Sequence, residues 1–225
     1  MLPEEISIII PTFNEKGTIS QCLETVVGIP GIEVIIADGG STDRTVEIAE
    51  QHRDVKVVTS LMGRSIQMNK GAECADGKIL LFLHADCVLS REVVLNVRNV
   101  LGGHSFVGGA FKIRLLSDKL LYRIIEKGIN FRSKIFKLPY GDQGLFVKRS
   151  VFEELGGFRE MLNCEDLDFV CRLKKQGKIA ILDERISSSI RRWENHGILQ
   201  TSLRNQFLLA SYILGRKSFN HIYSQ

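Results

Sequence analysis

Short aliphatic runs alternate with amphipathic stretches along the N-terminal part of this chain. The runs cover residues 6–10, 34–37, 55–59 and 79–83. Each lies beside a segment whose apolar residues repeat with the period of a helix, which is the pattern of βαβ units. The runs are nearly unbroken, as expected for parallel strands that helices cover on both faces. The sequence therefore predicts an α/β fold with a Rossmann-like, mostly parallel sheet flanked by helices.

Polar residues cluster where three of these runs end. The clusters cover residues 12–15, 38–41 and 84–86. In open α/β sheets, ligands bind at the edge formed by the carboxyl ends of the strands. We therefore expect a ligand site at this edge.

Beyond residue 104 the regular alternation stops. Strand patterns cover residues 106–115 and 143–147, and helical patterns cover residues 117–136, 165–176 and 198–214. No linker rich in proline, glycine or serine separates two parts of the chain. We predict a single domain over residues 1–225, with a first half of about residues 1–104 and a second half of about residues 105–225.

Charge and cysteine content exclude several classes of protein. Thirty Lys and Arg residues against 26 Asp and Glu residues give a net charge of +4, a small excess for a nucleic-acid-binding protein. The five cysteines are odd in number and never spaced C-x-x-C, which argues against a disulfide framework and a zinc knuckle. The N-terminus lacks a basic leader, and no window approaches the ~20 apolar residues of a membrane span. We expect a cytoplasmic protein that binds no nucleic acid.

The turn after the second run carries candidate ligand-binding groups. Asp38 ends the run, Gly39 and Gly40 follow in a tight turn, and a helix begins after them. A carboxylate in this position can accept hydrogen bonds from a nucleobase or from ribose hydroxyls. The alternative is that Asp38 and Asp43 only cap the turn and the helix. The spacing matches neither a G-x-G-x-x-G fingerprint nor a P-loop.

Segments 7–15 and 34–45 resemble the opening of the family 2 inverting glycosyltransferases with the GT-A fold. In that family the first strand ends in a P-x-x-N-E-type motif, and a D-G-S-x-D-x-T turn follows; this chain has one additional glycine, Gly40. The similarity continues through residues 63–72, 82–86, 141–144, 156–158 and 165–168. The pattern resembles the short bacterial subgroup whose metal motif reads H-A-D, and it covers about residues 6–200.

This resemblance implies a nucleotide-sugar-binding first half and an acceptor-binding, catalytic second half. The residues that it assigns to the nucleotide sugar are Pro11, Thr12, Phe13, Glu15, Asp38, Gly39, Arg64, Lys70, Ala85 and Asp86. Arg64 and Lys70 are placed near the base or the diphosphate, since a guanidinium can donate two hydrogen bonds to phosphate and an ammonium acts as a point charge. For Lys70 the alternative is a solvated helix face.

The resemblance also implies a metal site. Asp86 is similar to the last carboxylate of the family's D-x-D motif, which would bind Mn²⁺ or Mg²⁺ against the two phosphates. His84 stands in place of the first Asp, and we favour a hydrogen bond to nearby backbone over metal ligation for its imidazole. His196 is a candidate further ligand, and its alternative is a surface histidine.

Glu165 and Asp166 begin a predicted helix. Backbone N–H groups at a helix N-terminus hold a carboxylate in place and favour its charged form. The resemblance assigns the general base to Asp166 and lets Glu165 orient or contact the sugar. Four further residues are expected near the acceptor or the diphosphate, namely Asp142, Arg191, Arg192 and Trp193.

A basic amphipathic helix is predicted over residues 117–136. At about 100° per residue, one quadrant holds Lys119, Arg123, Lys127 and Lys134. The adjoining half is apolar, with Leu120, Leu121, Ile124, Ile125, Phe131, Ile135 and Phe136. Either the basic face meets anionic lipid headgroups or a phosphorylated acceptor, or the helix packs on the core and its basic face is solvated.

The leading hypothesis is metal-assisted, inverting transfer of a sugar from a nucleoside diphosphate sugar, with UDP-sugar as the first choice and GDP-sugar as the second. We expect an anionic or lipid-linked acceptor and a peripheral contact with the inner face of the membrane. One alternative is a sugar-phosphate nucleotidyltransferase, which would need a glycine-rich phosphate loop that residues 11–17 lack. Another is a non-catalytic protein that binds a nucleotide or a membrane surface, suggested by His84 in the metal motif.

Overall fold

The computed structural model describes residues 5–103, 105–161 and 163–198, together with residues 200, 201, 207 and 212. The elements are β1 (Ile6–Thr12), α1 (Ile19–Val26), β2 (Ile32–Asp38), α2 (Thr45–Glu50), β3 (Val55–Thr59), α3 (Arg64–Glu73), β4 (Ile79–Phe82), β5 (Cys87–Val88), α4 (Arg91–Gly102), β6 (Gly108–Leu115), α5 (Leu120–Phe136), the 3₁₀-helix η1 (Gly141–Gln143), β7 (Leu145–Lys148), α6 (Arg149–Glu154), α7 (Glu165–Gln176), β8 (Ile179–Ser188) and α8 (Arg191–His196). No helix within these residues is both long enough and apolar enough to cross a bilayer.

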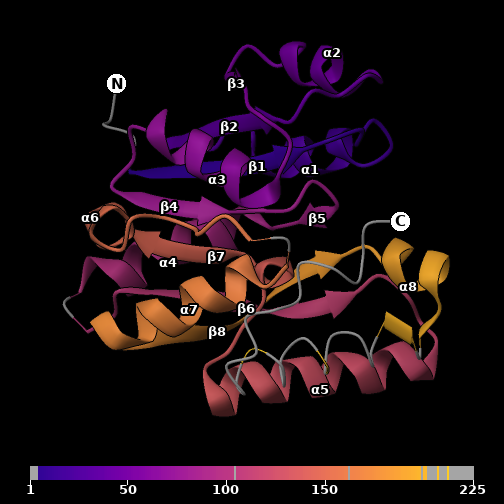
Figure 1. Ribbon diagram of the computed structural model, residues 1–225, viewed down its shortest axis with the longest axis vertical. Helices are drawn as coiled ribbons and strands as arrows, with labels where there is room; N and C mark the ends of the chain where they lie inside the picture. Colours follow the sequence, from indigo (N-terminus) through magenta and orange to yellow (C-terminus); the bar gives the residue numbers. More distant parts are fainter. Residues whose placement is uncertain are drawn as a thin grey trace.

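One eight-stranded sheet has the order β3-β2-β1-β4-β7-β6-β8-β5 (Figure 1). Strands β1 to β4 run parallel to one another, as the four aliphatic runs predict. Strand β7 is antiparallel to both of its neighbours, β4 and β6. Strand β8 pairs in parallel with β6, and β5 lies antiparallel at the end of the sheet. The predicted α/β fold with a mostly parallel N-terminal half is confirmed.

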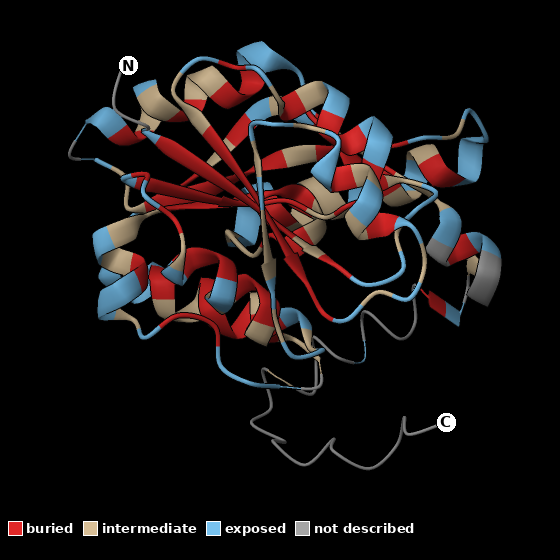
Figure 2. Cartoon of the chain, turned by 90° about the horizontal axis from the view of Figure 1, so that it is seen from above, coloured by how far each residue is buried: buried red, intermediate tan, exposed pale blue. Residues whose placement is uncertain are grey.

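The sheet separates two hydrophobic layers. Along β1, Ile8 and Ile10 point into the layer formed with α1 and α4, whereas Ile9 points into the layer formed with α3, α6 and α7. Successive side chains of a strand face opposite sides, so both faces of β1 are buried. Figure 2 shows the central strands of the sheet largely buried and the helices exposed on their outward faces. This double burial explains why the runs contain so few polar residues.

Four phenylalanines attach α6 and α7 to the end of β4. The rings of Phe82, Phe152, Phe158 and Phe169 form pairs whose centroids lie 4.5–5.7 Å apart. All four rings are buried. Aromatic pairs at these distances stabilise by ~0.5–1.5 kcal/mol beyond simple burial. The cluster therefore holds α7 firmly beside β4, whose carboxyl end carries the H-A-D motif.

A polar face of α5 covers a free edge of β6. Strand β6 pairs with β7 only at Gly108 and Gly109. Further along that edge, the Asn130 side chain accepts a hydrogen bond from the N–H of Ile113 and donates one to its carbonyl, both at 2.9 Å. Glu126 accepts a hydrogen bond from the N–H of Leu115 at 3.2 Å. Side chains of the helix thus replace the missing strand as partners of the backbone.

This arrangement corrects the expected orientation of the helix. The buried residues of α5 are Tyr122, Glu126 and Ser133, whereas its large apolar side chains Leu120, Leu121, Ile124, Phe131, Ile135 and Phe136 are exposed. Of the expected apolar half only Ile125 packs, partly buried, against the core. The other six side chains point outward, because unpaired N–H and C=O groups at a strand edge need polar partners. Arg123, which was expected on the outer basic face, turns back to Glu126 at 2.7 Å and donates to the carbonyls of Leu115 and Ser117.

Several boundaries also differ from the predictions. Helix α5 begins at Leu120, after a segment without helical structure, and not at residue 117. Gln143, expected to start a strand, belongs to η1, and β7 begins at Leu145. The expected closing helix over residues 198–214 falls largely outside the described residues.

We predict that Asn130→Ala lowers the free energy of unfolding by about 2–4 kcal/mol, because it leaves both backbone groups of Ile113 without their partner. Urea denaturation measures the change. Lys127→Ala, on the exposed side of the same helix, is the matched control and should change stability by less than about 0.5 kcal/mol. Equal effects of the two substitutions would contradict the proposed role of the polar face.

Candidate active site

Two loops at the carboxyl ends of β1 and β2 hold each other in place. The N–H of Asn14 donates to Ser41 Oγ at 2.8 Å, and Asn14 Oδ1 accepts from the N–H of Thr42 at 2.9 Å. The next residue, Glu15, donates its N–H to Thr45 Oγ1 at 2.8 Å. Asn14 adopts a left-handed conformation with φ 55°, which asparagine tolerates better than most residues. These contacts fix the backbone from which the Glu15 side chain projects.

Asp38 builds the turn and does not line the cavity described below. Its Oδ1 accepts hydrogen bonds from Thr12 Oγ1 and Ser41 Oγ, at 3.0 and 2.6 Å. Its Oδ2 accepts from the N–H groups of Gly40 and Ser41, at 2.9 and 2.8 Å. A carboxylate has about four acceptor positions, and these four donors occupy them. These contacts match the capping alternative, and the expected contact of Asp38 with base or ribose stays a prediction.

The Gln67 side chain on α3 connects the carboxyl ends of β1 and β2. Its Nε2 donates to the carbonyls of Thr12 and Ala37 at 2.7 and 3.0 Å, and the side chain is buried. A Cβ on Gly39 would lie 3.0 Å from the Gln67 side chain, so Gly39 permits this close approach. This close approach gives Gly39 a structural role, and its expected place at the donor stays a prediction. The sequence signals for Gln67 were its place in the family-like segment 63–72 and its position one turn after Arg64.

A cavity of about 450 Å³ opens beside these loops. Eight of the residues that sequence analysis singled out line it, namely Pro11, Thr12, Phe13, Glu15, Arg64, Ala85, Asp86 and Arg191. Met62, Gly63, Gln67 and His84 complete the lining. Lys70 is not part of it, because its ammonium group pairs with Glu73 at 3.1 Å on an exposed face of α3. This position matches the solvated alternative for Lys70.

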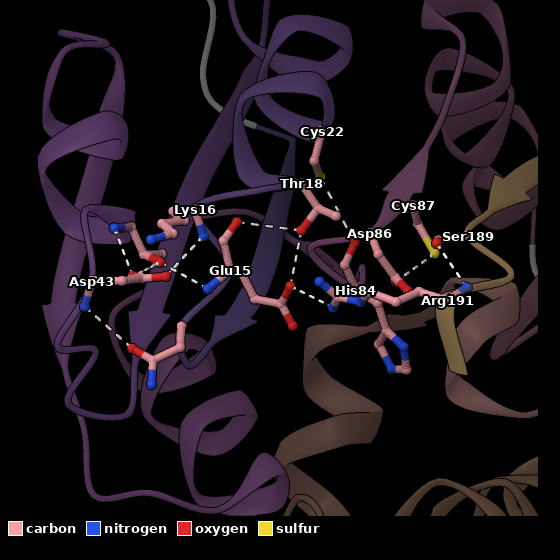
Figure 3. Close-up of polar contacts among 12 residues, drawn as sticks. Glu15, Lys16, Thr18, Cys22, Asp43, His84, Asp86, Cys87, Ser189 and Arg191 are labelled. Carbon is pink, nitrogen blue, oxygen red and sulfur yellow. Dashed lines mark hydrogen bonds and ion pairs between the residues drawn. The ribbon is translucent and has the colours of Figure 1, made fainter. Parts of the chain in front are cut away.

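Two carboxylates and an arginine meet at the wall of the cavity (Figure 3). Arg191 Nη2 lies 2.7 Å from Glu15 Oε2, which also accepts a hydrogen bond from Thr18 Oγ1 at 2.9 Å. Burial, together with the charge of Glu15, raises the pKa of Asp86, while the nearby Arg191 acts in the opposite direction. Asp86 is therefore a carboxylate whose negative charge is poorly compensated by the protein alone.

Asp166 lies at the N-terminus of α7, held by two backbone groups. The N–H of Gly141 donates to its Oδ2 at 2.6 Å, and the N–H of Leu167 donates to its Oδ1 at 2.7 Å. A Cβ on Gly141 would lie 3.0 Å from His84 Nε2 and 3.3 Å from Asp166 Oδ2. The imidazole of His84 and the carboxylate of Asp166 thus converge on the backbone of Gly141, and of these three residues only His84 lines the cavity.

The neighbouring Glu165 is buried and forms an ion pair with Arg64 at 3.1 Å. Burial raises the pKa of Glu165, the charge of Asp166 adds to this effect, and Arg64 opposes it. This ion pair connects the cavity to the N-terminus of α7.

Gln143 holds the loop that carries Gly141. Its side chain is fully buried and donates to the carbonyl of Phe111 at 3.0 Å. Its Oε1 accepts from Ser133 Oγ at 2.6 Å and from the N–H of Tyr140 at 3.3 Å. Gln143 belongs to the family-like segment 141–144, but the sequence alone predicted no role for it.

The remaining expected residues lie around this centre. Asp142 is half-buried in η1, between Gly141 and Gln143. Trp193 is buried in the hydrophobic core and does not line the cavity. Arg192 and His196 belong to α8, and their side chains lie outside the described residues. No cluster of three potential metal ligands occurs among the side chains that the structure describes.

The model of the family described as glycosyl transferase family 2 matches residues 7–156. The chain belongs to glycosyl transferase family 2. It is 29% identical over 174 residues to the PGL/p-HBAD biosynthesis glycosyltransferase of Mycobacterium tuberculosis, and this match covers 68% of the chain and 62% of the relative. The chain thus spans about three fifths of the length of this curated relative.

Solved structures show the same fold. TarS of S. aureus in complex with UDP-GlcNAc superposes with a TM-score of 0.66 at 20% identity, covering 82% of this chain and 58% of TarS. The mannosyltransferase PcManGT from Pyrobaculum calidifontis, in complex with GDP-Man and Mn²⁺, also has a TM-score of 0.66 at 20% identity, covering 84% and 58%. The family 2 chain therefore has the expected GT-A fold.

We predict that Asp86→Asn makes the protein more stable at neutral pH. The raised pKa means that the folded state keeps a proton on Asp86 over a pH range where the unfolded chain has lost it. The contribution of Asp86 to the free energy of unfolding therefore falls as pH rises through that range. The neutral amide of the Asp86→Asn variant does not titrate and so avoids this loss of stability. Urea denaturation between acidic and neutral pH should show a difference that disappears at the acidic end.

Asp183→Asn is the control with the opposite sign. Its hydrogen bond and ion pair with Lys112 lower the pKa of Asp183, so this exposed carboxylate stabilises the fold above its ordinary pKa. Asp183→Asn should therefore give no gain at neutral pH. If Asp86→Asn were less stable than wild type at neutral pH, the account of its electrostatics would be wrong.

Proposed function

We propose that this chain transfers a sugar from a nucleoside diphosphate sugar to an acceptor hydroxyl with inversion, and that Asp166 is the general base. The observation that carries the proposal is the position of the Asp166 carboxylate. Two N–H groups orient it, and across Gly141 it lies near His84, which lines the cavity, although Asp166 itself is not part of the lining. Each oxygen keeps a second acceptor position for the proton of an incoming hydroxyl.

The cavity is suited to a nucleoside diphosphate sugar. Arg64 and Arg191 line it, and a guanidinium can donate two hydrogen bonds to a phosphate. Both arginines are paired with carboxylates, Arg64 with Glu165 and Arg191 with Glu15, so their orientation is fixed before a ligand binds. TarS binds UDP-GlcNAc and PcManGT binds GDP-Man. We keep UDP-sugar as the preferred donor and GDP-sugar as the second choice.

The donor set at Asp86 fits Mg²⁺ or Mn²⁺. Carboxylate oxygens are the ligands these ions prefer, and Mg²⁺ typically binds one or two carboxylates together with substrate phosphates. Asp86, with the charge of Glu15 nearby, offers this arrangement, and the described residues provide no third ligand. The phosphates of the donor would complete the site. A bound divalent ion would offset the charge that develops on the diphosphate.

The reaction follows from the placement of the protein groups. The acceptor hydroxyl attacks the anomeric carbon and passes its proton to Asp166. The bond from the anomeric carbon to the diphosphate oxygen breaks, and the nucleoside diphosphate leaves with the bonding electrons. Arg64 and Arg191 stabilise the charge of the leaving group. Because the displacement is a single step in line, it inverts the anomeric configuration.

The acceptor and the cellular location are also part of the proposal. We expect an anionic or lipid-linked acceptor, bound where η1 meets the N-terminus of α7, and a cytoplasmic protein. Family membership favours glycosyl transfer over the nucleotidyltransferase alternative.

We predict that Asp166→Asn lowers kcat by about 10²–10⁴-fold, because the amide cannot accept the acceptor proton. The affinity for the nucleotide should change little, since the base acts on the acceptor and not on the donor. Nucleotide release during turnover and calorimetric titration with UDP or GDP in the presence of Mn²⁺ measure the two quantities.

Asp168→Asn on the same helix is the matched control. Asp168 pairs with Arg172 at 2.7 Å and with Arg159 at 3.2 Å, so its loss should reduce stability and leave kcat of the folded enzyme near the wild-type value. Unchanged kcat in folded Asp166→Asn would refute its role as the base, and failure of the wild type to bind either nucleotide would refute the proposed donor class.

A further inference from the structure

Helix α5 presents a continuous apolar stripe to solvent. Leu120, Ile124, Phe131 and Ile135 follow one another at helical spacing, and each of these side chains is more than half exposed, at 75, 58, 62 and 57%. Figure 1 places the helix along the lower edge of the molecule. Exposed apolar side chains grouped in this way mark an interaction surface, whereas single exposed ones are common.

The outward direction of the stripe is fixed by the fold. The opposite face of the helix carries Glu126 and Asn130, which hold the backbone of β6. Turning the apolar stripe inward would remove these partners from the strand edge. The helix therefore displays its apolar face even though the sequence could have buried it.

The exposed charged side chains that α5 carries beside the stripe are positive. Lys119, Lys127 and Lys134 are exposed. Glu126 is the only acid between Lys119 and Lys137, and it is buried between Arg123 and Arg185 at 2.7 and 3.5 Å. Two exposed acids, Asp118 and Asp183, lie on the flanking segments rather than on the helix, and Asp183 pairs with Lys112.

We propose that α5 is a membrane-docking helix that inserts its apolar stripe into the surface of an anionic phospholipid bilayer. A helix with an apolar face edged by lysines lies in the plane of such an interface, with its lysines at the headgroups. A second copy of this chain fits less well. A two-fold interface would place the same lysines opposite each other, and the helix offers no exposed acid to pair with them.

The docked helix would bring the catalytic loop close to the bilayer. Tyr140 and η1 follow α5 after a short segment, and Gly141 in η1 holds Asp166. If the proposed function holds, an acceptor carried by a lipid would reach the base from the membrane side. The docking itself does not depend on that function.

Vesicle flotation without nucleotide tests the docking. The wild type should bind vesicles of phosphatidylcholine with phosphatidylglycerol, and should bind phosphatidylcholine vesicles much more weakly. Phe131→Ser should weaken binding at least about tenfold, because a buried aromatic side chain contributes that much or more to partitioning. Lys127→Glu combined with Lys134→Glu should weaken it about 25-fold or more, since each basic side chain near an anionic surface strengthens binding about fivefold.

Matched controls separate docking from general changes in hydrophobicity and charge. Leu61→Ser removes an apolar side chain that is 76% exposed, outside α5. Arg44→Glu combined with Arg53→Glu changes the net charge equally, around α2 on the opposite side of the molecule (Figure 1). Both controls should bind like the wild type. Circular dichroism confirms that each variant is folded.

Two results would overturn the proposal. One is a wild type that ignores anionic vesicles at low ionic strength, where surface charges are least screened. The other is a wild type that forms a dimer by light scattering, which Phe131→Ser dissociates, without any vesicle binding. The second result would make the stripe a contact between copies of the chain. Neither outcome bears on nucleotide binding, so the proposed function is tested separately.

Discussion

The hydrogen bonds between the polar face of α5 and the free edge of β6 determine how the second half of the molecule is arranged. Asn130 replaces a neighbouring strand for Ile113, and Ser133 on the same face donates to Gln143. Gln143 in turn binds the carbonyl of Phe111, the next free group along that edge. The backbone groups of one strand edge thus anchor both the helix and the loop that follows it.

This anchoring has two consequences at opposite sides of α5. On the inner side, the fixed loop directs the N–H of Gly141 at Asp166 and so places the proposed base. On the outer side, the apolar residues of the helix face solvent, which creates the proposed docking surface. The proposed catalytic geometry and the proposed membrane contact would therefore both result from the same interaction.

Much of the donor half was predictable from the sequence. The aliphatic runs predicted the positions of β1 to β4, because parallel strands between two layers of helices consist largely of aliphatic residues. The resemblance to family 2 then identified most residues of the cavity, including Glu15, Asp86 and Arg191. The sequence left two roles open for Asp38, since the same carboxylate chemistry serves a ligand or a turn. Only the three-dimensional positions of its four donors distinguish these roles.

The orientation of α5 could not be predicted in this way. Helical periodicity shows which residues share a face, but not which face turns toward the protein. That choice depends on β6 separating from β7 after Gly109, a long-range feature that leaves backbone groups in need of partners. The role of Gln143 could not be predicted for the same reason, because it depends on hydrogen bonds to Phe111 and Ser133, which are not its neighbours in sequence.

The strand edge of β6 positions the proposed base through Gln143, and the substitution Gln143→Leu tests this dependence. Leucine fills a similar volume but cannot bind Phe111, Ser133 or the N–H of Tyr140. In the folded variant we expect kcat for nucleotide release to fall by ~10- to 100-fold, as small misplacements of a catalytic group do, with an unchanged Kd for the nucleotide. A folded Gln143→Leu protein with wild-type kcat would contradict the account.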